Sequence, residues 1–248
     1  MPLFVTDVEL LKTSRAMPAP EASDAARQRR MDNRPQIALF LHIPKCGGTS
    51  AAHLWRSVYP GGVVTTHLNA PSDKKHSRIH EVSDAFDVSF STVRHPLTWY
   101  ESWWRYLLSP KVTDREETLD ANGRPNFDTW IGEGVWHPLR RIAHCHDRSF
   151  RTFIDNVISD QPGFVSSMYE EYLGSHQSTA TVDHIIKMES LHASFRELCR
   201  TYGWRAPEAP KHENQSLKSL TTDWTENQIV KMQDLERNAL ERFGYSQR

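Results

Sequence analysis

Residues 37–50 read IALFLHIPKCGGTS, and this stretch decides how the rest of the chain is interpreted. Its apolar start, residues 37–41, is typical of a short buried strand, and the apolar run stops at Pro44. After two glycines, apolar residues recur at helical spacing, at Ala51, Leu54, Trp55 and Val58. The pattern therefore predicts a strand, a tight loop and a helix in direct succession.

The loop of this unit carries groups that suit a phosphate or a sulfate. The start of a helix presents backbone N–H groups without intrahelical partners, together with the positive end of the helix dipole. Gly47 and Gly48 have no Cβ, so the backbone can approach an anion closely. Lys45 adds a positive charge, and Thr49 and Ser50 add hydroxyl donors. A Walker A loop is excluded, because in that motif the lysine follows the second glycine.

A second motif follows further along the chain. The β-branched and aromatic run 88–93 predicts a strand, and Pro96 suits the first position of a helix. Arg94 ends the strand, and Ser102 lies off the apolar stripe of the helix. An arginine fork and a serine hydroxyl can hold one phosphate together. The alternatives are a surface salt bridge for Arg94 and a solvated helix position for Ser102. The predicted apolar stripe consists of Trp99, Tyr100, Trp103 and Leu107.

Both motifs resemble those of PAPS-dependent sulfotransferases, in the branch of heparan and chondroitin enzymes and their bacterial relatives. Pro-Lys-x-Gly-Gly-Thr-Ser resembles the 5′-phosphosulfate loop, with Cys46 where the family usually has Thr. Arg94, Pro96 and Ser102 are in register with the 3′-phosphate motif Arg-Asn-Pro-x-x-Arg-x-x-Ser-x-Tyr. The chain departs from that motif at His95, Trp99 and Trp104.

The resemblance implies a P-loop-like α/β core with a mainly parallel sheet and helices on both faces. Alternation of strands and helices along the chain independently favours a parallel sheet. The implied activity moves a sulfuryl group from PAPS to a hydroxyl acceptor, expected to be a carbohydrate, and releases PAP without a metal. The alternatives are an inactive nucleotide-binding or glycan-binding protein and a nucleotide kinase. The expected PAPS-binding residues are Lys45, Cys46, Gly47, Gly48, Thr49, Ser50, Arg94 and Ser102.

Transfer to a hydroxyl requires a base that accepts the proton of the acceptor. The family often has a histidine before the 3′-phosphate arginine, and both His67 and His76 fit that place. The sequence leaves the choice between them open, with His80 and Glu81 as further options. Lys45 is the other expected catalytic residue, because it would neutralise charge on the leaving oxygen.

Length and composition predict one domain, residues 36–248, after an N-terminal arm, residues 1–35. The formal net charge of −1 gives no global field that favours nucleic acid. The three cysteines, Cys46, Cys145 and Cys199, are too widely spaced to predict a disulfide framework. With no signal-peptide pattern and no apolar run of transmembrane length, we expect a cytoplasmic protein of undetermined oligomeric state.

The polar segment 109–147 is the expected acceptor-site insertion, because long loops in compact domains are often functional. Its aromatic and basic residues either contact the acceptor or belong to the core and a solvated face. They are Trp130, Trp136, Arg140 and Arg141. His144, Cys145 and His146 invite a metal interpretation, but no second ligand cluster at zinc spacing accompanies them.

The remaining pattern predicts helices at 150–158, 164–173 and 191–202, and a strand at 183–189. Glu189 and Leu191 match the family's strand-to-helix junction. Thr225 and Gln228 predict a capping box that begins a single final helix, ended by Gly244. A loop before that helix resembles a nucleotide-covering loop of the family through Lys211, Asn214, Ser216 and Lys218.

Overall fold

The computed structural model describes residues 38–58, 63–65, 77–82, 86, 88–114, 119–120, 126, 129, 136–175, 182–201 and 220–246. These residues divide into two compact units. The sheet unit comprises the described parts of 38–93 and 171–201, and the helical unit those of 94–170 and 220–246. The expected N-terminal arm, residues 1–35, lies outside the described residues.

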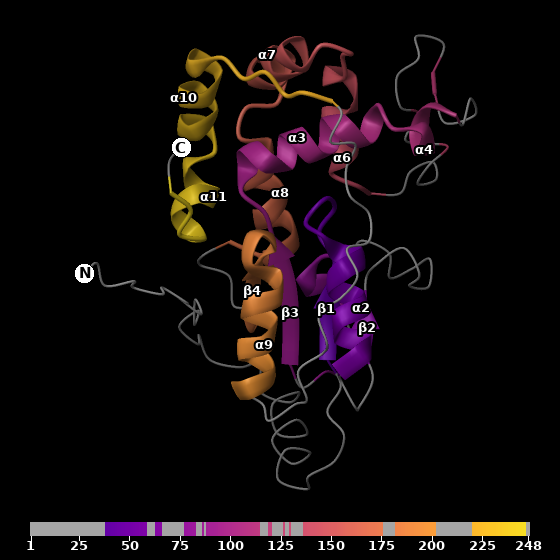
Figure 1. Cartoon of the computed structure of the whole chain (residues 1–248), viewed down its shortest axis with the longest axis vertical. Coiled ribbons are helices and arrows are strands. Elements are labelled where there is room, and N and C mark those ends of the chain that lie inside the picture. Colours follow the sequence, from indigo (N-terminus) through magenta and orange to yellow (C-terminus); the bar gives the residue numbers. More distant parts are fainter. Residues whose placement is uncertain are drawn as a thin grey trace, which may run out of the picture. The chain divides into compact units, whose positions relative to one another are not determined.

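The sheet unit contains a small parallel sheet whose four strands lie in the order β2-β1-β3-β4 (Figure 1). Register pairs Leu41 with Ser91 and Phe90 with His184. The prediction of an α/β fold with a parallel sheet is therefore confirmed. The strands are β1 (Ala38–Leu41), β2 (Val63–Thr65), β3 (Val88–Val93) and β4 (His184–Lys187).

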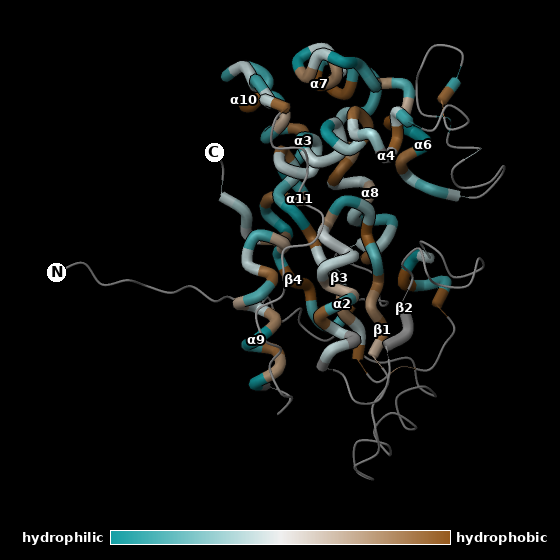
Figure 2. The backbone as a smooth tube through the Cα atoms, turned by 45° about the vertical axis from the view of Figure 1, so that its right-hand side comes forward, coloured by the Kyte–Doolittle hydropathy of each residue, from teal (hydrophilic) through white to brown (hydrophobic). Residues whose placement is uncertain are grey.

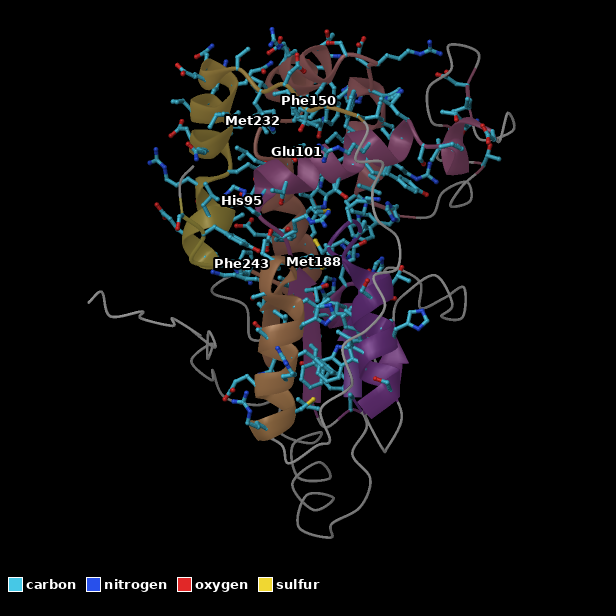
Figure 3. The ribbon with its side chains drawn as sticks, in the orientation of Figure 1. His95, Glu101, Phe150, Met188, Met232 and Phe243 are labelled. Carbon is cyan, nitrogen blue, oxygen red and sulfur yellow. The ribbon has the colours of Figure 1, made fainter. Side chains whose placement is uncertain are left out.

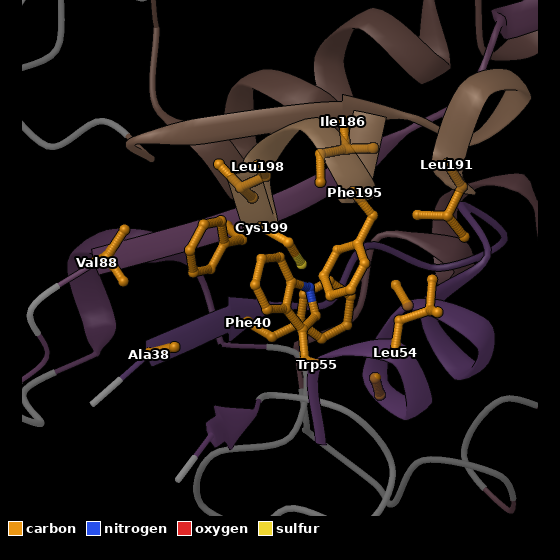
Figure 4. Packing of buried hydrophobic residues seen from close by; sticks show 13 residues of the cluster. Ala38, Phe40, Leu54, Trp55, Val88, Ile186, Leu191, Phe195, Leu198 and Cys199 are labelled. Carbon is orange, nitrogen blue, oxygen red and sulfur yellow. The ribbon is translucent and has the colours of Figure 1, made fainter. Parts of the chain in front are cut away.

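Two helices, α2 (Gly48–Val58) and α9 (Leu191–Thr201), share one hydrophobic cluster with β1, β3 and β4. Trp55 of α2, labelled in Figure 4, lies within this cluster. Its ring stacks on that of Phe90 of β3, with centroids 3.9 Å apart. Phe195 of α9 meets the same tryptophan edge-on at 4.5 Å. Hydrophobic and hydrophilic residues alternate along α9, as Figure 2 shows. This helix therefore turns one side to the core, as its apolar spacing predicts.

The opposite face of the two central strands is buried as well. Leu39, Leu41 and Ser91 point to that face and are fully buried. The Ser91 hydroxyl donates to the backbone oxygen of Leu41 at 2.9 Å, which ties the carboxyl ends of β1 and β3 together. Burial on both faces agrees with the continuous apolar run of β1, whereas β3 is equally buried although it alternates apolar residues with Ser89 and Ser91.

The helical unit is built around the aromatic stripe of α3 (Pro96–Leu107), which is buried as predicted. Trp99 packs against Trp103 and Phe164, with centroids 6.1 and 5.5 Å away. The other helices of this unit are α4 (Pro110–Thr113), α6 (Leu139–Ile142), α7 (Phe150–Asp160), α8 (Phe164–Leu173, whose last residues belong to the sheet unit), α10 (Glu226–Leu235) and α11 (Arg237–Arg242).

The prediction of a single final helix is wrong, because the chain breaks into α10 and α11 at Glu236. The predicted capping box at Thr225 and Gln228 is confirmed. Strand β4 is also shorter than predicted, since a 3-10 turn, η4 (Met188–Ser190), follows it directly. No helix in the described part of the chain combines the length and apolarity needed to cross a bilayer.

The break at Glu236 places a carboxylate in the core of the helical unit. This fully buried side chain accepts from the Tyr100 hydroxyl at 2.5 Å and from the backbone N–H of Val165 at 3.0 Å. Ser166 donates through both its N–H and its hydroxyl, each at 2.7 Å. Two of these donors belong to the first turn of α8, where N–H groups lack intrahelical partners. Burial raises the pKa of Glu236, although these hydrogen bonds act in the opposite direction.

We expect Tyr100→Phe to lower the free energy of unfolding by about 1–3 kcal/mol, the usual cost when a buried polar group loses a hydrogen-bond partner. Urea denaturation followed by circular dichroism measures the change. Asp234→Asn is the control, because it removes only an exposed ion pair with Arg237 and should cost less than about 1 kcal/mol. Equal effects of the two substitutions would show that the buried network does not stabilise the unit.

Candidate functional site

The loop between β1 and α2 brings the predicted residues 45–50 together at the carboxyl end of β1. The Cys46 N–H donates to the Ile43 oxygen at 3.3 Å, which makes the turn tight. The Ala51 N–H donates to the Gly47 oxygen at 3.0 Å, which is the first backbone hydrogen bond of α2. The N–H groups of residues 48–50 come before this bond, at the helix start, where the helix itself supplies no carbonyl acceptor. The first turn of α2 contains no acidic residue. No side chain of that turn therefore neutralises the positive end of the helix.

The loop backbone is unusual at two positions. Lys45 has φ 63°, the one positive value at a non-glycine residue in the described ranges, and Gly47 has φ 75°. A left-handed conformation costs an ordinary residue about 1–2 kcal/mol, and such costs concentrate at binding sites. Positive φ on both sides of Cys46 is the kind of alternation that turns successive N–H groups toward one side. The loop geometry thus favours an anion-binding concavity.

The two glycines are in close contact with neighbouring side chains, which would have to move to admit a Cβ. A Cβ on Gly47 would lie 2.0 Å from the sulfur of Met188, which is labelled in Figure 3. A Cβ on Gly48 would lie 1.8 Å from Nδ1 of His42. Met188 belongs to η4, far from the loop in sequence, so sequence reasoning did not find it. His42 is buried directly against the helix start.

The loop residues differ in their access to solvent. Lys45, Thr49 and Ser50 are partly exposed, whereas the side chain of Cys46 is fully buried. The thiol therefore faces the interior of the sheet unit. A ligand in the loop would meet the backbone at this position rather than the side chain.

Arg94 directly follows β3 in the chain and belongs to the helical unit. Its backbone N–H donates to the Tyr169 hydroxyl at 3.0 Å, and that hydroxyl donates to the Arg94 oxygen at 2.7 Å. Among the residues with described positions, none forms a hydrogen bond or ion pair with its guanidinium. Within the described part of the chain, the surface salt bridge considered for Arg94 is therefore not seen.

The other positions of the second motif are buried. Ser102 is only 7% exposed, so it is not the solvated helix residue of the alternative interpretation. His95 caps α3, because its Nδ1 accepts from the Leu97 N–H at 3.2 Å. Trp99, at the place of the family's second arginine, packs in the aromatic core and offers no cation. Trp104 donates through Nε1 to the Asp147 oxygen at 2.9 Å.

Two of the four candidates for the catalytic base fall outside the described residues. This holds for both His67 and His76. His80 is exposed on the short 3-10 turn η1 (Ile79–Glu81). Glu81 forms an ion pair with Arg78 and accepts from its backbone N–H at 2.7 Å. The hydrogen bond from Arg78 lowers the pKa of Glu81, which makes this carboxylate a weaker base.

The predicted acceptor-site segment, 109–147, is partly described and partly helical. Trp130 lies outside the described residues, and Trp136 is 37% exposed. Arg141 donates to the Ser167 hydroxyl at 3.3 Å and lies over the Phe164 ring at 5.3 Å. Its guanidinium therefore has contacts within the helical unit. The loop residues Lys211, Asn214, Ser216 and Lys218 also lie outside the described residues.

A third cluster, outside both motifs, joins His144, Cys145 and Asp160, whose potential ligand atoms lie within 4.8 Å of one another. The His144 Nε2 atom lies 3.7 Å from the Cys145 sulfur and 3.6 Å from an Asp160 oxygen. Burial raises the pKa of Cys145 to about 12, helped by the nearby Asp160 charge. A metal ion that bound here would displace the thiol proton, because metal ions bind the thiolate. Asp160 was missed from the sequence, because it comes from a separate helix.

Comparison of the chain with protein-family models, curated proteins and solved structures found no match in any of the three. The functional assignment therefore depends on the chemistry of the two motifs.

We expect Gly48→Ala to destabilise the protein by about 1–3 kcal/mol, the usual cost of overpacking a filled site. The added methyl group would overlap the imidazole of His42. Thermal unfolding of Gly48→Ala, His42→Ala and the double variant measures the coupling between the two positions. The double variant should be more stable than the sum of the single effects predicts. Additive losses would show that His42 is not the group that excludes a side chain at residue 48.

Proposed function

We propose that this protein is a sulfotransferase that moves a sulfuryl group from PAPS to a hydroxyl group of a carbohydrate acceptor and releases PAP. The loop between β1 and α2 is the observation that carries the proposal. There a partly exposed lysine with a left-handed backbone lies beside a helix start that has no acidic residue in its first turn. Such a helix start is a ready-made site for a phosphate group.

The strand order supports a nucleotide site at the same edge of the sheet. In the order β2-β1-β3-β4, the chain continues from β1 to β2 on one side of the sheet, and from β3 to β4 on the other side. Open parallel α/β sheets bind ligands outside the carboxyl ends of strands at such a switch point. The loop between β1 and α2, residues 42–47, is called the anion loop here. It begins at the end of β1, and Arg94 follows the end of β3. We interpret this arrangement as a P-loop-like core.

The proposed roles follow from charge. The N–H groups of residues 48–50 hold the 5′-phosphate, and Lys45 neutralises charge on the oxygen that the sulfuryl group leaves. Arg94 holds the 3′-phosphate with its bidentate fork, and the Ser102 hydroxyl assists. The acceptor oxygen bonds to sulfur as the bond from sulfur to the phosphate oxygen breaks, and the acceptor proton passes to a base. Positioning and electrostatics dominate such a transfer.

Two observations favour an inactive PAP-binding protein as the second candidate. The Cys46 thiol is buried, and Trp99 fills the core at the place of a family arginine. This candidate binds PAP but transfers no sulfuryl group from PAPS to any acceptor. The nucleotide kinase is a weaker alternative, because the loop lacks the residue order of Walker A.

Calorimetric titration with PAP, ATP and AMP tests the proposal directly. We expect PAP to bind much more tightly than AMP, which lacks the 3′-phosphate, and more tightly than ATP. Turnover of PAPS against a panel of glycan acceptors then separates the enzyme from the inactive binder. Equal binding of ATP and PAP would favour the kinase, and no binding of PAP would overturn the proposal.

Arg94→Ala should weaken PAP binding by roughly 1.5–3 kcal/mol, the value of a hydrogen bond to a charged group. AMP binding should stay the same, because AMP lacks the phosphate that Arg94 contacts. The matched control is Arg151→Ala, which removes an exposed arginine paired with Asp223 from the same unit. Calorimetry measures all three proteins. An unchanged PAP affinity in Arg94→Ala would disprove the 3′-phosphate assignment.

Lys45→Ala should lower kcat about 10²–10³-fold, the usual loss when one group that stabilises transition-state charge is removed. Alanine and lysine share the same cost at positive φ, so the substitution removes the charge and leaves the backbone preference unchanged. Lys231→Ala, on the exposed side of α10, is the control. Turnover of PAPS measures the effect. A Lys45→Ala variant with wild-type kcat would remove Lys45 from the mechanism.

A further inference from the structure

We propose that Tyr169 is a positioning residue for Arg94, and that its hydroxyl sets the preference for a nucleotide with a 3′-phosphate. The inference rests on the function proposed above. It also concerns a contact within one unit, because Tyr169 and Arg94 both belong to the helical unit.

The Tyr169 hydroxyl satisfies both backbone groups of Arg94. It accepts from the Arg94 N–H at 3.0 Å and donates to the Arg94 oxygen at 2.7 Å. A hydroxyl can donate and accept at the same time, so one side chain replaces two ladder partners. Buried backbone groups need such partners. This contact therefore fixes the Arg94 peptide groups on both sides of its Cα.

The tyrosine is itself held in place. Tyr169 is 1% exposed on α8, and its ring meets the ring of Phe243 edge-on at 5.3 Å. On the other side of Arg94, the backbone is fixed by the start of α3. The His95 oxygen accepts from the Trp99 N–H and from the Thr98 hydroxyl, each at 2.9 Å. Figure 3 labels His95 and Phe243.

Arg94 is thus fixed at its backbone, while no described residue binds its guanidinium. An arginine loses much rotamer freedom when it binds a ligand, and a fixed Cα reduces the freedom that remains to be lost. Arg94, which would contact the ligand, is thus held in position by the hydrogen bonds of Tyr169, which would not touch the ligand. Removal of the hydroxyl should therefore weaken the contact that Arg94 makes and no other contact of the nucleotide.

Tyr169→Phe tests the inference, because it removes the hydroxyl and keeps the ring against Phe243. We expect PAP affinity to fall about tenfold, the effect of one lost hydrogen bond, with AMP affinity unchanged. Tyr100→Phe is the matched control, since it removes another buried tyrosine hydroxyl of the same unit, one that contacts Glu236 instead. It should leave the ratio of PAP to AMP affinity at the wild-type value. An equal loss of PAP and AMP affinity in Tyr169→Phe would indicate a merely structural role and overturn the inference.

A double variant and hydrogen exchange complete the test. In the Arg94→Ala background, Tyr169→Phe should change PAP affinity less than twofold, because the two residues act as one unit. The amide of Arg94 should exchange at least tenfold faster in Tyr169→Phe than in Tyr100→Phe, whether or not a nucleotide is present. An unchanged exchange rate of the Arg94 amide in Tyr169→Phe would overturn the role of Tyr169 but would not affect the proposed function. Absence of PAP binding in the wild type would overturn the proposed function and, with it, this role.

Discussion

The parallel pairing of β1 with β3 is the constraint on which the sheet unit depends. The Trp55–Phe90 stack closes one face of this pair, and the Ser91 hydroxyl joins the two strand ends. Because Trp55 belongs to α2, the same contact that covers the sheet also fixes where α2 begins. The position of the anion loop, between the end of β1 and the start of α2, is therefore determined by core packing.

Much of the fold was predictable, because the sequence within several strands and helices is enough to indicate them. The run of β1 is apolar throughout, β3 is rich in β-branched and aromatic residues, and Pro96 marks the start of α3. The break between α10 and α11 was not predictable, because an apolar stripe continues across it. Glu236 is satisfied there by donors from α3 and α8, which are distant in sequence.

The site divides in the same way. The residue order of the loop and the spacing of Arg94 and Ser102 are visible in the sequence, but the contacts that surround these residues are not. The Met188 side chain packs against residue 47, and the Tyr169 hydroxyl binds both backbone groups of Arg94. Both partners come from segments far along the chain, and nothing in their own neighbourhood marks them. Trp99 shows the opposite case, since its aromatic character predicted the core position that it occupies.

The stability of the helical unit depends on pH through the buried carboxyl group of Glu236. Burial raises its pKa above the ordinary carboxyl value, so the folded chain holds this proton more tightly than the unfolded chain does. Between the ordinary value and the raised one, folding therefore takes up a proton. The contribution of this group to stability is complete below that window and is lost as pH rises through the folded-state pKa. The residue that accepts hydrogen bonds from α3 and α8 is thus also one at which acid favours the fold.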